Sequence, residues 1–511
     1  MSQSFDVAVV GYGPTGAMAA GLLGRLGLNV IVFDEQTTVY DKPRAISLDH
    51  EIARLFQQLG IWDKIEPFTE PFTDSVYFGV NGDMIKCMST VPPPYPLAHW
   101  PSMVFSQPAL ERVLRDHIEQ LPNIEVRLGK RVLGVEQNRD QVDLFLGKDQ
   151  ARVTAKYVIA CDGASSTIRS QLELPLIDLD FDEAWLVIDV LVNDQGKKKL
   201  PRTSVQYCHP DRPSSYLICP GNHRRWELAI NPGEDPAALA TAKGAWRMLR
   251  PWLCEKDGTL WRQASYRFHA LVAQDWQRGR VFIAGDAAHQ QPPFLGQGMC
   301  QGLRDVANLT WKLAAVLHGK AQVGLLESYG PERRGHVIAL TNRIKHIGQL
   351  IGERNLEQAL SRDQHLLREA NGVVKPTPRQ DVQPPLGDGL LYGPAGAARG
   401  TLFPQPWLRP DNGVQVRMDD LFGYGWRLVS KVTTLPQDLY DMSRGLGLTL
   451  ISLGSAPALE VDAILSHWFA KYQVAYAVVR PDHYVYGAFQ EADAVKRALQ
   501  ELKKTFNKGV A

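Results

Sequence analysis

Three short segments of this sequence combine glycine with acidic residues in a way suited to binding a phosphorylated, hydroxyl-rich ligand. They are Gly11-Tyr12-Gly13-Pro14-Thr15-Gly16, Cys161-Asp162-Gly163 and Gly285-Asp286. Glycines let backbone N–H groups approach phosphate oxygens, and a carboxylate accepts hydrogen bonds from sugar hydroxyls. The residue types therefore predict that the three segments bind one dinucleotide.

The elements around these segments support the same interpretation. Each segment follows a run of apolar, β-branched residues typical of a buried parallel strand. The three runs are 6–10, 157–160 and 279–284. A helix-like stretch, 17–26, comes directly after the first segment, which gives the order strand, turn, helix. Together the three contexts predict an FAD held in a doubly wound α/β domain, and therefore an oxidoreductase.

Individual residues of these segments have separate expected roles. Gly11 makes the tight turn, Gly13 lets the backbone approach the pyrophosphate, and Gly16 lets helix and strand pack closely. The second strand, 29–33, ends at Asp34, near the spacing of about 20 residues at which a carboxylate binds a ribose hydroxyl. Asp286 is expected to bind the ribityl hydroxyls.

A loop rich in proline and glycine follows Asp286 and leads into a long amphipathic helix that Gly319 is placed to end. Such a loop directs backbone N–H groups and the positive end of a helix toward whatever lies above it. Reduced flavin is anionic, so this arrangement stabilises the reduced cofactor. His289, inside the loop, is expected to shape it by hydrogen bonding.

These segments, together with Pro43-Arg44-Ala45 and the string from Gly296 to Leu313, resemble the class A flavoprotein aromatic hydroxylases. The similarity is greatest to the branch of 3-(3-hydroxyphenyl)propionate hydroxylase and phenol hydroxylase, and it covers residues 1 to about 345 well. It implies hydroxylation of a phenolic compound, ortho to its hydroxyl group and 3-(3-hydroxyphenyl)propionate-like. NADH or NADPH would be the transient reductant and O₂ the oxygen source, through a flavin hydroperoxide.

The resemblance also implies which residues bind the cofactor. Asp162 and Arg169 would link the flavin pyrophosphate to the transient nicotinamide site. The full expected set is Gly11, Gly13, Pro14, Thr15, Gly16, Asp34, Glu35, Arg44, Gln107, Asp162, Arg169, Gly285, Asp286, Pro293, Gly296, Gln297, Gly298 and Met299.

The motif positions predict three units. The α/β, doubly wound FAD-binding domain (GR2-type, 4-hydroxybenzoate hydroxylase-like) takes 1–75, 103–180 and 278–385. An inserted β-sheet substrate-binding domain takes 76–102 and 181–277, with a hairpin around Pro220-Gly221-Asn222. The third unit, 387–511, looks like a thioredoxin-like C-terminal domain. It has no cysteine after Cys300, so a dithiol redox role is excluded, and packing or homodimer formation remains.

Phenol hydroxylation benefits from a base or acceptor for the substrate hydroxyl and from exclusion of water. The candidate catalytic residues are Asp49, His50, Tyr207, Tyr216 and Tyr266. Histidine titrates near neutral pH and could take a phenolic proton. His50 is equally well read as a helix-start residue, and a strand tyrosine is commonly a core residue. Arg224 and Arg225, near a hairpin tip, are expected to be solvated.

Composition excludes several other classes of protein. The 56 basic and 55 acidic residues nearly cancel, so neither nucleic acid nor an anionic membrane is an expected partner. No transmembrane stretch and no signal peptide are expected. The six cysteines are scattered and no His cluster has metal-ligand spacing, which fits a reduced cytoplasmic protein without a metal site.

Several alternatives remain at this stage. The substrate of a hydroxylase could be a larger polycyclic or heteroaromatic compound. A flavin-dependent halogenase would need a Trp-x-Trp-x-Ile-Pro motif, which is absent, and an isoprenoid reductase would need a more apolar pocket segment. A non-catalytic flavoprotein scaffold would need a damaged flavin loop, and Gly296, Gln297 and Gly298 look intact.

Overall fold

A largely parallel sheet forms the first layer of the computed structural model, which describes residues 5–147, 151–396, 398–410, 413–454 and 459–506. Its strand order is β17-β18-β11-β1-β2-β8, with β10 and β9 attached beside β11. Strands β18, β11, β1, β2 and β8 are parallel neighbours, and burial on both faces explains their apolar sequences. The strands are β1 (Phe5–Val10), β2 (Val30–Asp34), β8 (Ile124–Leu128), β9 (Val132–Gln137), β10 (Val142–Leu146), β11 (Ala151–Ala160), β17 (Gln277–Arg278) and β18 (Val281–Ile283).

Helices pack on this sheet and on one another. Helix α1 (Pro14–Arg25) begins just beyond the carboxyl end of β1 and lies against α9 (Gly298–Leu317) and α4 (Gln107–Ile118). The remaining helices of this part are α2 (His50–Leu59), α3 (Trp62–Ile65), α5 (Thr167–Gln171), α10 (Tyr329–Gly352) and α11 (Leu356–Glu369). A small sheet, β3 (Ser47–Asp49), β7 (Ser102–Phe105) and β4 (Thr69–Pro71), connects this domain to the next.

The second layer is a nine-stranded sheet in the order β19-β16-β12-β15-β14-β13-β5-β6-β20. The predicted hairpin is present, because β14 and β15 pair antiparallel. The sheet draws β19 and β20 from segments that the sequence analysis gave to the FAD-binding domain. Its strands are β5 (Ser75–Phe78), β6 (Met84–Ser89), β12 (Leu176–Val192), β13 (Ser204–Tyr207), β14 (Ser214–Ile218), β15 (His223–Ala229), β16 (Gly258–Ala273), β19 (His289–Gln290) and β20 (Thr377–Pro378).

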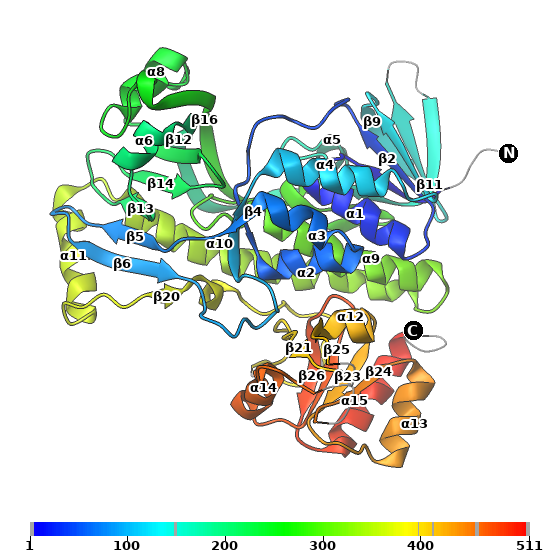
Figure 1. Ribbon diagram of the computed structural model, residues 1–511. Helices are drawn as coiled ribbons and strands as arrows, with labels where there is room; N and C mark the ends of the chain where they lie inside the picture. Colours follow the sequence, from blue (N-terminus) through cyan, green and yellow to red (C-terminus); the bar gives the residue numbers. More distant parts are fainter. Residues whose placement is uncertain (1–4, 148–150, 397, 411–412, 455–458, 507–511) are drawn as a thin grey trace.

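The two faces of this sheet have different surroundings. Because side chains alternate along a strand, Tyr216 and Trp226 lie on one face, in an apolar core closed by α6 (Asp194–Lys199), α7 (Pro236–Leu239) and α8 (Ala242–Leu249). The other face turns toward the FAD-binding domain. Figure 1 shows the nine-stranded sheet beside the parallel sheet, joined by the long helix α10.

The C-terminal unit is a separate α/β layer (Figure 1). Its four-stranded sheet has the order β24-β23-β25-β26, in which β23 and β24 are parallel and the other neighbours antiparallel. The element order and the mixed sheet agree with the predicted thioredoxin-like unit. The elements are β21 (Trp407–Leu408), β22 (Val416–Arg417), α12 (Met418–Phe422), β23 (Arg427–Ser430), α13 (Gln437–Leu446), β24 (Thr449–Ser452), α14 (Ile464–Tyr472), β25 (Tyr476–Val479), β26 (Val485–Phe489) and α15 (Ala492–Thr505).

Buried ion pairs tie the C-terminal unit to the rest of the chain. Asp419 accepts hydrogen bonds from Arg54 of α2 (2.7 Å) and from Arg427 of β23 (2.6 Å). Burial alone would raise the pKa of Asp419, but the two guanidinium groups outweigh it and hold the pKa well below its ordinary value. The carboxylate therefore stays ionised, and the C-terminal unit is fixed rather than loosely tethered.

The described residues contain neither a membrane-spanning helix nor a cluster of metal ligands. No described helix is both long enough and apolar enough to cross a membrane. No group of three or more described His, Cys, Asp or Glu side chains is arranged to hold a metal ion. All six cysteines are free thiols.

Candidate active site

A cavity of about 720 Å³ lies where the parallel sheet, the nine-stranded sheet and the loop before α9 meet. The carboxyl ends of β1, β2 and β11 open into it, which is where open α/β sheets bind ligands. One end of it is lined by the glycine segment that follows β1, and the other end by apolar and aromatic side chains. The predicted cofactor residues that line it are Gly11, Gly13, Pro14, Thr15, Asp34, Glu35, Arg44, Gln107, Asp162, Asp286, Pro293, Gly296, Gly298 and Met299.

The first glycine segment has the geometry that its expected roles require. Gly11 has a φ of +96°, and a Cβ on it would lie 2.3 Å from the carbonyl oxygen of Cys161. A Cβ on Gly16 would lie 1.9 Å from the carbonyl oxygen of Gly11, so α1 packs on the turn without room for a side chain. A Cβ on Gly13 would meet no protein atom within 4 Å and would project into the cavity. Gly13 is therefore the position where backbone can approach a phosphate.

This difference gives a matched pair of variants. Gly16→Ala should lower the free energy of unfolding of the cofactor-free protein by about 1–3 kcal/mol, because a methyl group is forced against backbone. Gly13→Ala should leave that free energy unchanged and weaken FAD binding only. Urea unfolding of the cofactor-free proteins and FAD titration measure the two effects, and a destabilised Gly13→Ala protein would contradict the assignment.

At the adenosine end, the acidic residues after β2 are already partly engaged by protein. Asp34 accepts hydrogen bonds from the backbone N–H of Tyr12 (2.6 Å) and of Gln36 (2.7 Å). Glu35 faces Arg131 at 3.7 Å. A carboxylate has further lone pairs, so both side chains remain able to accept a ribose hydroxyl.

The segment after β11 holds one acceptor without a protein donor. Asp162 Oδ2 accepts from the backbone N–H of Ile168 (3.2 Å), while Oδ1 is buried with no partner among the described residues. Arg169, expected to bind cofactor, instead donates to the carbonyl oxygens of Ala287 and Ala164 (2.9 Å each) and does not line the cavity. Arg169 therefore holds two backbone segments beside the cavity in place and does not contact the cavity itself.

Arg44 is placed by its backbone. Gln107 Oε1 accepts from the N–H groups of Arg44 (3.1 Å) and Ala45 (2.5 Å), and Arg225 donates to the carbonyl oxygens of Arg44 (2.7 Å) and Pro43 (2.9 Å). The sequence analysis expected Arg224 and Arg225 to be solvated, and this was wrong. Both are about 95% buried, because the segment before β3 covers Arg225 and because Arg224 folds back onto carbonyl oxygens of its own hairpin.

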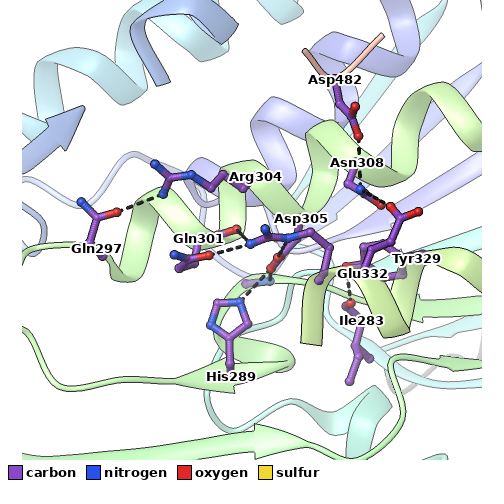
Figure 2. Close-up of polar contacts among 12 residues, drawn as sticks. Ile283, His289, Gln297, Gln301, Arg304, Asp305, Asn308, Tyr329, Glu332 and Asp482 are labelled. Atoms are coloured by element: carbon purple, nitrogen blue, oxygen red, sulfur yellow. Dashed lines mark hydrogen bonds and ion pairs between the residues drawn. The ribbon is translucent and has the colours of Figure 1, made fainter. Parts of the chain in front are cut away.

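A buried network shapes the turn that carries Asp286 (Figure 2). Asp305 accepts from His289 Nε2 (2.8 Å), from the backbone N–H of Gly285 (3.0 Å) and from Arg333 Nε (2.9 Å). His289 thus shapes the loop by hydrogen bonding, as predicted. Asp286 faces the cavity, and its side chain has no hydrogen bond among the described residues. Burial by the surrounding protein raises the pKa of Asp286, and the nearby His289 and Arg44 partly oppose this rise.

The loop before α9 is supported from beneath. Gln297, expected to bind cofactor, turns its side chain away from the cavity, where Oε1 accepts from Arg304 Nη1 and Gln383 Nε2 (3.0 Å each). Arg304 also pairs with Asp49 and Glu51 (2.5 Å each). The backbone of Pro293, Gly296, Gly298 and Met299 remains at the cavity wall. Figure 2 shows Arg304 and Gln297 meeting at the start of α9.

The donors and open acceptors fit FAD. Gly13 would carry the pyrophosphate, Asp34 or Glu35 the ribose, Asp162 Oδ1 and Asp286 the remaining hydroxyls, and the loop at 293–299 the pyrimidine end of the ring. This assignment of individual residues stays a prediction.

The five candidate catalytic residues do not converge on the cavity. Tyr207 and Tyr216 lie on the far face of the nine-stranded sheet, where Tyr207 accepts from Trp252 Nε1 (3.2 Å) and Tyr216 donates to Pro201 O (3.3 Å). Tyr266 is 37% exposed, stacks on Phe268 and lies outside the cavity walls. The expectation that these tyrosines line the pocket is corrected: for Tyr207 and Tyr216 the reason is the alternation of side chains along their strands, whereas Tyr266 is in phase with the cavity residue Phe268 but lies beyond the cavity wall.

Asp49 and His50 lie beneath the cavity rather than in its wall. Asp49 caps α2, accepting from the N–H of Glu51 (3.1 Å), and pairs with Arg304. His50 begins α2, as the alternative interpretation held. Burial lowers the pKa of His50 to about 4, which Asp49 only partly opposes. It is therefore neutral at pH 7 and unsuited to exchange a phenolic proton in the cavity.

Other residues line the substrate end, and most of them were missed from the sequence. Gln206, Ser215 and Leu217 alternate with Tyr207 and Tyr216, so the signal that could have found them was the other phase of these strands. The residues lining this end are Ser75, Tyr77, Gln206, Ser215, Leu217, Arg225, Glu227, Phe268 and Arg379, with Phe72, Met88 and Phe294 as apolar neighbours.

Comparisons with known proteins identify the family of this chain. Residues 4–344 match the FAD binding domain family, and residues 400–505 match the HcaD C-terminal domain. A probable NADH-specific resorcinol 4-hydroxylase of Rhodococcus jostii is 32% identical over 520 residues, covering 98% of this chain and 95% of that protein. A 3-(3-hydroxy-phenyl)propionate/3-hydroxycinnamic acid hydroxylase of Burkholderia vietnamiensis is 32% identical over 514 residues, covering 94% and 93%.

Solved structures share the fold. The flavin-dependent monooxygenase PieE, in complex with FAD and substrate, superposes with a TM-score of 0.80 at 20% identity, covering 98% of this chain and 99% of that one. Aklavinone-11 hydroxylase with FAD and aklavinone gives 0.79 at 21% identity, covering 98% and 99%. Because the family model covers residues 4–344 and the two relatives match nearly the whole chain, the chain belongs to the FAD binding domain family and is a class A flavoprotein hydroxylase.

Proposed function

We propose that this protein hydroxylates a small phenolic compound, ortho to its hydroxyl group, using NADH or NADPH and O₂. The relatives support the choice of substrate class, because the names of both curated proteins describe hydroxylases of phenols. The naming of one of them as NADH-specific favours NADH as the reductant.

The observation that carries the proposal is a row of polar side chains across the cavity face of the nine-stranded sheet. Gln206, Ser215 and Glu227 face one another on β13, β14 and β15, in direct register. Gln206 Oε1 accepts from Ser215 Oγ, and Gln206 Nε2 donates to Ser75 Oγ (3.2 Å). Each of these side chains is at least 95% buried, so the row can recognise a hydroxyl group away from water.

Glu227 is the member of the row that is free to accept. It has no hydrogen bond among the described residues, and its nearest cation is Arg225, with Nη1 4.0 Å from Oε1. Burial raises the pKa of Glu227, which Arg225 opposes. We assign it, with Gln206, to binding the phenolic hydroxyl and orienting the ring.

Bound FAD would supply the electrons from the nicotinamide and the activated oxygen. The chain's own part is to hold the ring in place, to accept a hydrogen bond from its hydroxyl and to exclude water with Phe72, Phe268 and Phe294.

The function is tested with purified FAD-loaded protein, NADH or NADPH, and a panel containing resorcinol and 3-(3-hydroxyphenyl)propionate. At least one phenol should accelerate NAD(P)H oxidation, and its product should carry one oxygen atom from ¹⁸O₂. Oxidation that no phenol accelerates, with all oxygen recovered as hydrogen peroxide, would refute the proposal.

Glu227→Gln should weaken binding of the accepted phenol by up to about tenfold, because a carboxylate acceptor is replaced by a neutral amide of the same shape. It should also raise the hydrogen peroxide formed per NAD(P)H consumed. Glu255→Gln, at an exposed position, is the matched control. Equal affinity and coupling in the Glu227 variant would remove Glu227 from the site.

A further inference from the structure

We infer that Arg379 binds a carboxylate on the side chain of the substrate. This inference rests on the proposed function and narrows it to phenols that carry an acidic group. It starts from the segment between α11 and the C-terminal unit, which the sequence analysis placed at the end of the FAD-binding domain.

That segment forms one wall of the cavity. Thr377–Pro378 add strand β20 to the edge of the nine-stranded sheet, in parallel register with Met88 and Ser89 of β6. Immediately afterwards, Arg379 lies over the ring of Phe72 at 4.0 Å and reaches the cavity. Gln383 fixes the far end of the segment by donating to Gln297.

Arg379 is a buried cation without an anionic partner. It is 9% exposed, donates one hydrogen bond, from Nη2 to Leu295 O (2.8 Å), and forms no ion pair within the described ranges. Other deeply buried arginines are compensated: Arg54, Arg304 and Arg480 each pair with a carboxylate.

Arg379 also differs from Arg224 in the number of hydrogen bonds that it donates to protein. Arg224 also lacks a carboxylate among the described residues, but it donates to three backbone carbonyl oxygens. Arg379 has five N–H donors and uses one of them on protein. A charge held out of water without a partner is costly, so an anion in the cavity would compensate it.

The position of Arg379 indicates which end of a ligand it meets. In the sheet order, β14, β13, β5 and β6 lie between Glu227 on β15 and Arg379 after β20, and both side chains border the cavity. Five strand spacings of about 4.8 Å separate their strands, so Arg379 meets a part of the ligand that lies away from Glu227. A planar guanidinium binds a carboxylate through two parallel hydrogen bonds, so the ligand group that suits Arg379 is a carboxylate.

One other source could supply the anion, namely the pyrimidine end of the reduced flavin, since Leu295 belongs to the loop beneath it. The two sources are separated by measuring ligand selectivity and flavin potential on the same proteins.

The experiment uses FAD-loaded protein and two ligands that differ only in charge, 3-phenylpropionate and 3-phenylpropan-1-ol. Neither carries a phenolic hydroxyl, so binding is measured without turnover, from the change in flavin absorbance. The variants are Arg379→Met and Arg379→Lys. Arg267→Met tests a rival arginine at the cavity edge. Arg343→Met, which removes a charge near Val382 from outside the cavity, is the control.

Wild type and Arg343→Met should bind the acid at least about tenfold more tightly than the alcohol. In Arg379→Met the ratio should fall to about one through loss of acid affinity alone. Arg379→Lys keeps the charge without the paired donors, so its ratio should be intermediate. Because the ratio compares two ligands on one preparation, partial loss of folding does not imitate the effect, and the lysine variant carries the test if the methionine variant does not retain FAD.

Four results would overturn the inference: no preference in wild type, a preference that survives in Arg379→Met, a preference lost in Arg267→Met instead, or a change in the flavin midpoint potential alone. A carboxylate preference without hydroxylation of any phenol would refute the proposed function and leave the Arg379 site standing. Turnover of resorcinol without a carboxylate preference would refute the Arg379 site and leave the proposed function standing.

Discussion

Glu332→Gln should lower the free energy of unfolding by about 3–5 kcal/mol, because it leaves buried cations without their shared carboxylate. Glu332 is fully buried on α10, and its carboxylate accepts from Lys312 of α9 (2.7 Å) and from Arg480, at the end of β25 (2.7 Å). Asn308 donates to the same group (2.7 Å), as Figure 2 shows. The loss should be measured by urea unfolding of the full chain.

The effect of this substitution should depend on pH. Burial by itself would raise the pKa of Glu332, but Arg480 and Lys312 outweigh it and hold the pKa well below its ordinary value. A carboxylate with a lowered pKa in the folded state stabilises fully above the pKa it has when unfolded, about 4.3, and progressively less as the pH falls below it. The difference between wild type and Glu332→Gln should therefore be largest near neutral pH and shrink on acidification.

Glu327→Gln, an exposed position on the preceding turn, makes the same charge change and should cost little. Equal stability of the two variants, or a difference that grows in acid, would show that the carboxylate of Glu332 does not hold the C-terminal unit in place.

Asp286→Ala should weaken FAD binding by about 100-fold, because a charged acceptor for two ribityl hydroxyls is removed and each such bond contributes at least about 1.5 kcal/mol. The carboxylate faces the cavity without a protein donor among the described residues, so its loss leaves little to rearrange in the cofactor-free protein. FAD titration gives the dissociation constant, and acid precipitation shows how much FAD each preparation carries.

Asp275→Ala, at an exposed site before β18, serves as the control. The assignment fails if Asp286→Ala binds FAD as tightly as the control does. A variant that loses FAD and also unfolds at lower urea would instead mean that Asp286 supports the turn.

The cofactor end of the site could be predicted because its signals are local. Gly11, Gly13 and Gly16 act through a turn and one helix, and their spacing encodes that geometry directly. The nature of the fold followed from strands that are buried on both faces and therefore read as continuous apolar runs.

The substrate end could not be predicted in the same way, because the face of a strand that meets a ligand depends on partners far away in sequence. Tyr207 and Tyr216 looked suited to an aromatic substrate, yet they pack with Trp226 and Trp252, and the cavity receives their polar neighbours. Arg225 was expected to be solvated, but the segment at Pro43, which is distant in sequence, covers it in the structure. If the alternation along a strand is assigned one residue out of step, every side chain is placed on the wrong face of the sheet.

Residues 377–383 form a wall of the cavity and also belong to the connection that leads to the C-terminal unit. The short chain that connects the catalytic body to the C-terminal unit also borders the ligand, so the two halves are not interchangeable modules. A chimera that joined residues 1–375 to the tail of a relative would acquire the relative's residue at position 379, and that residue would then set the charge at this wall of the cavity. Exchange of the tail is thus a route by which substrate preference shifts without any substitution in the main sheet.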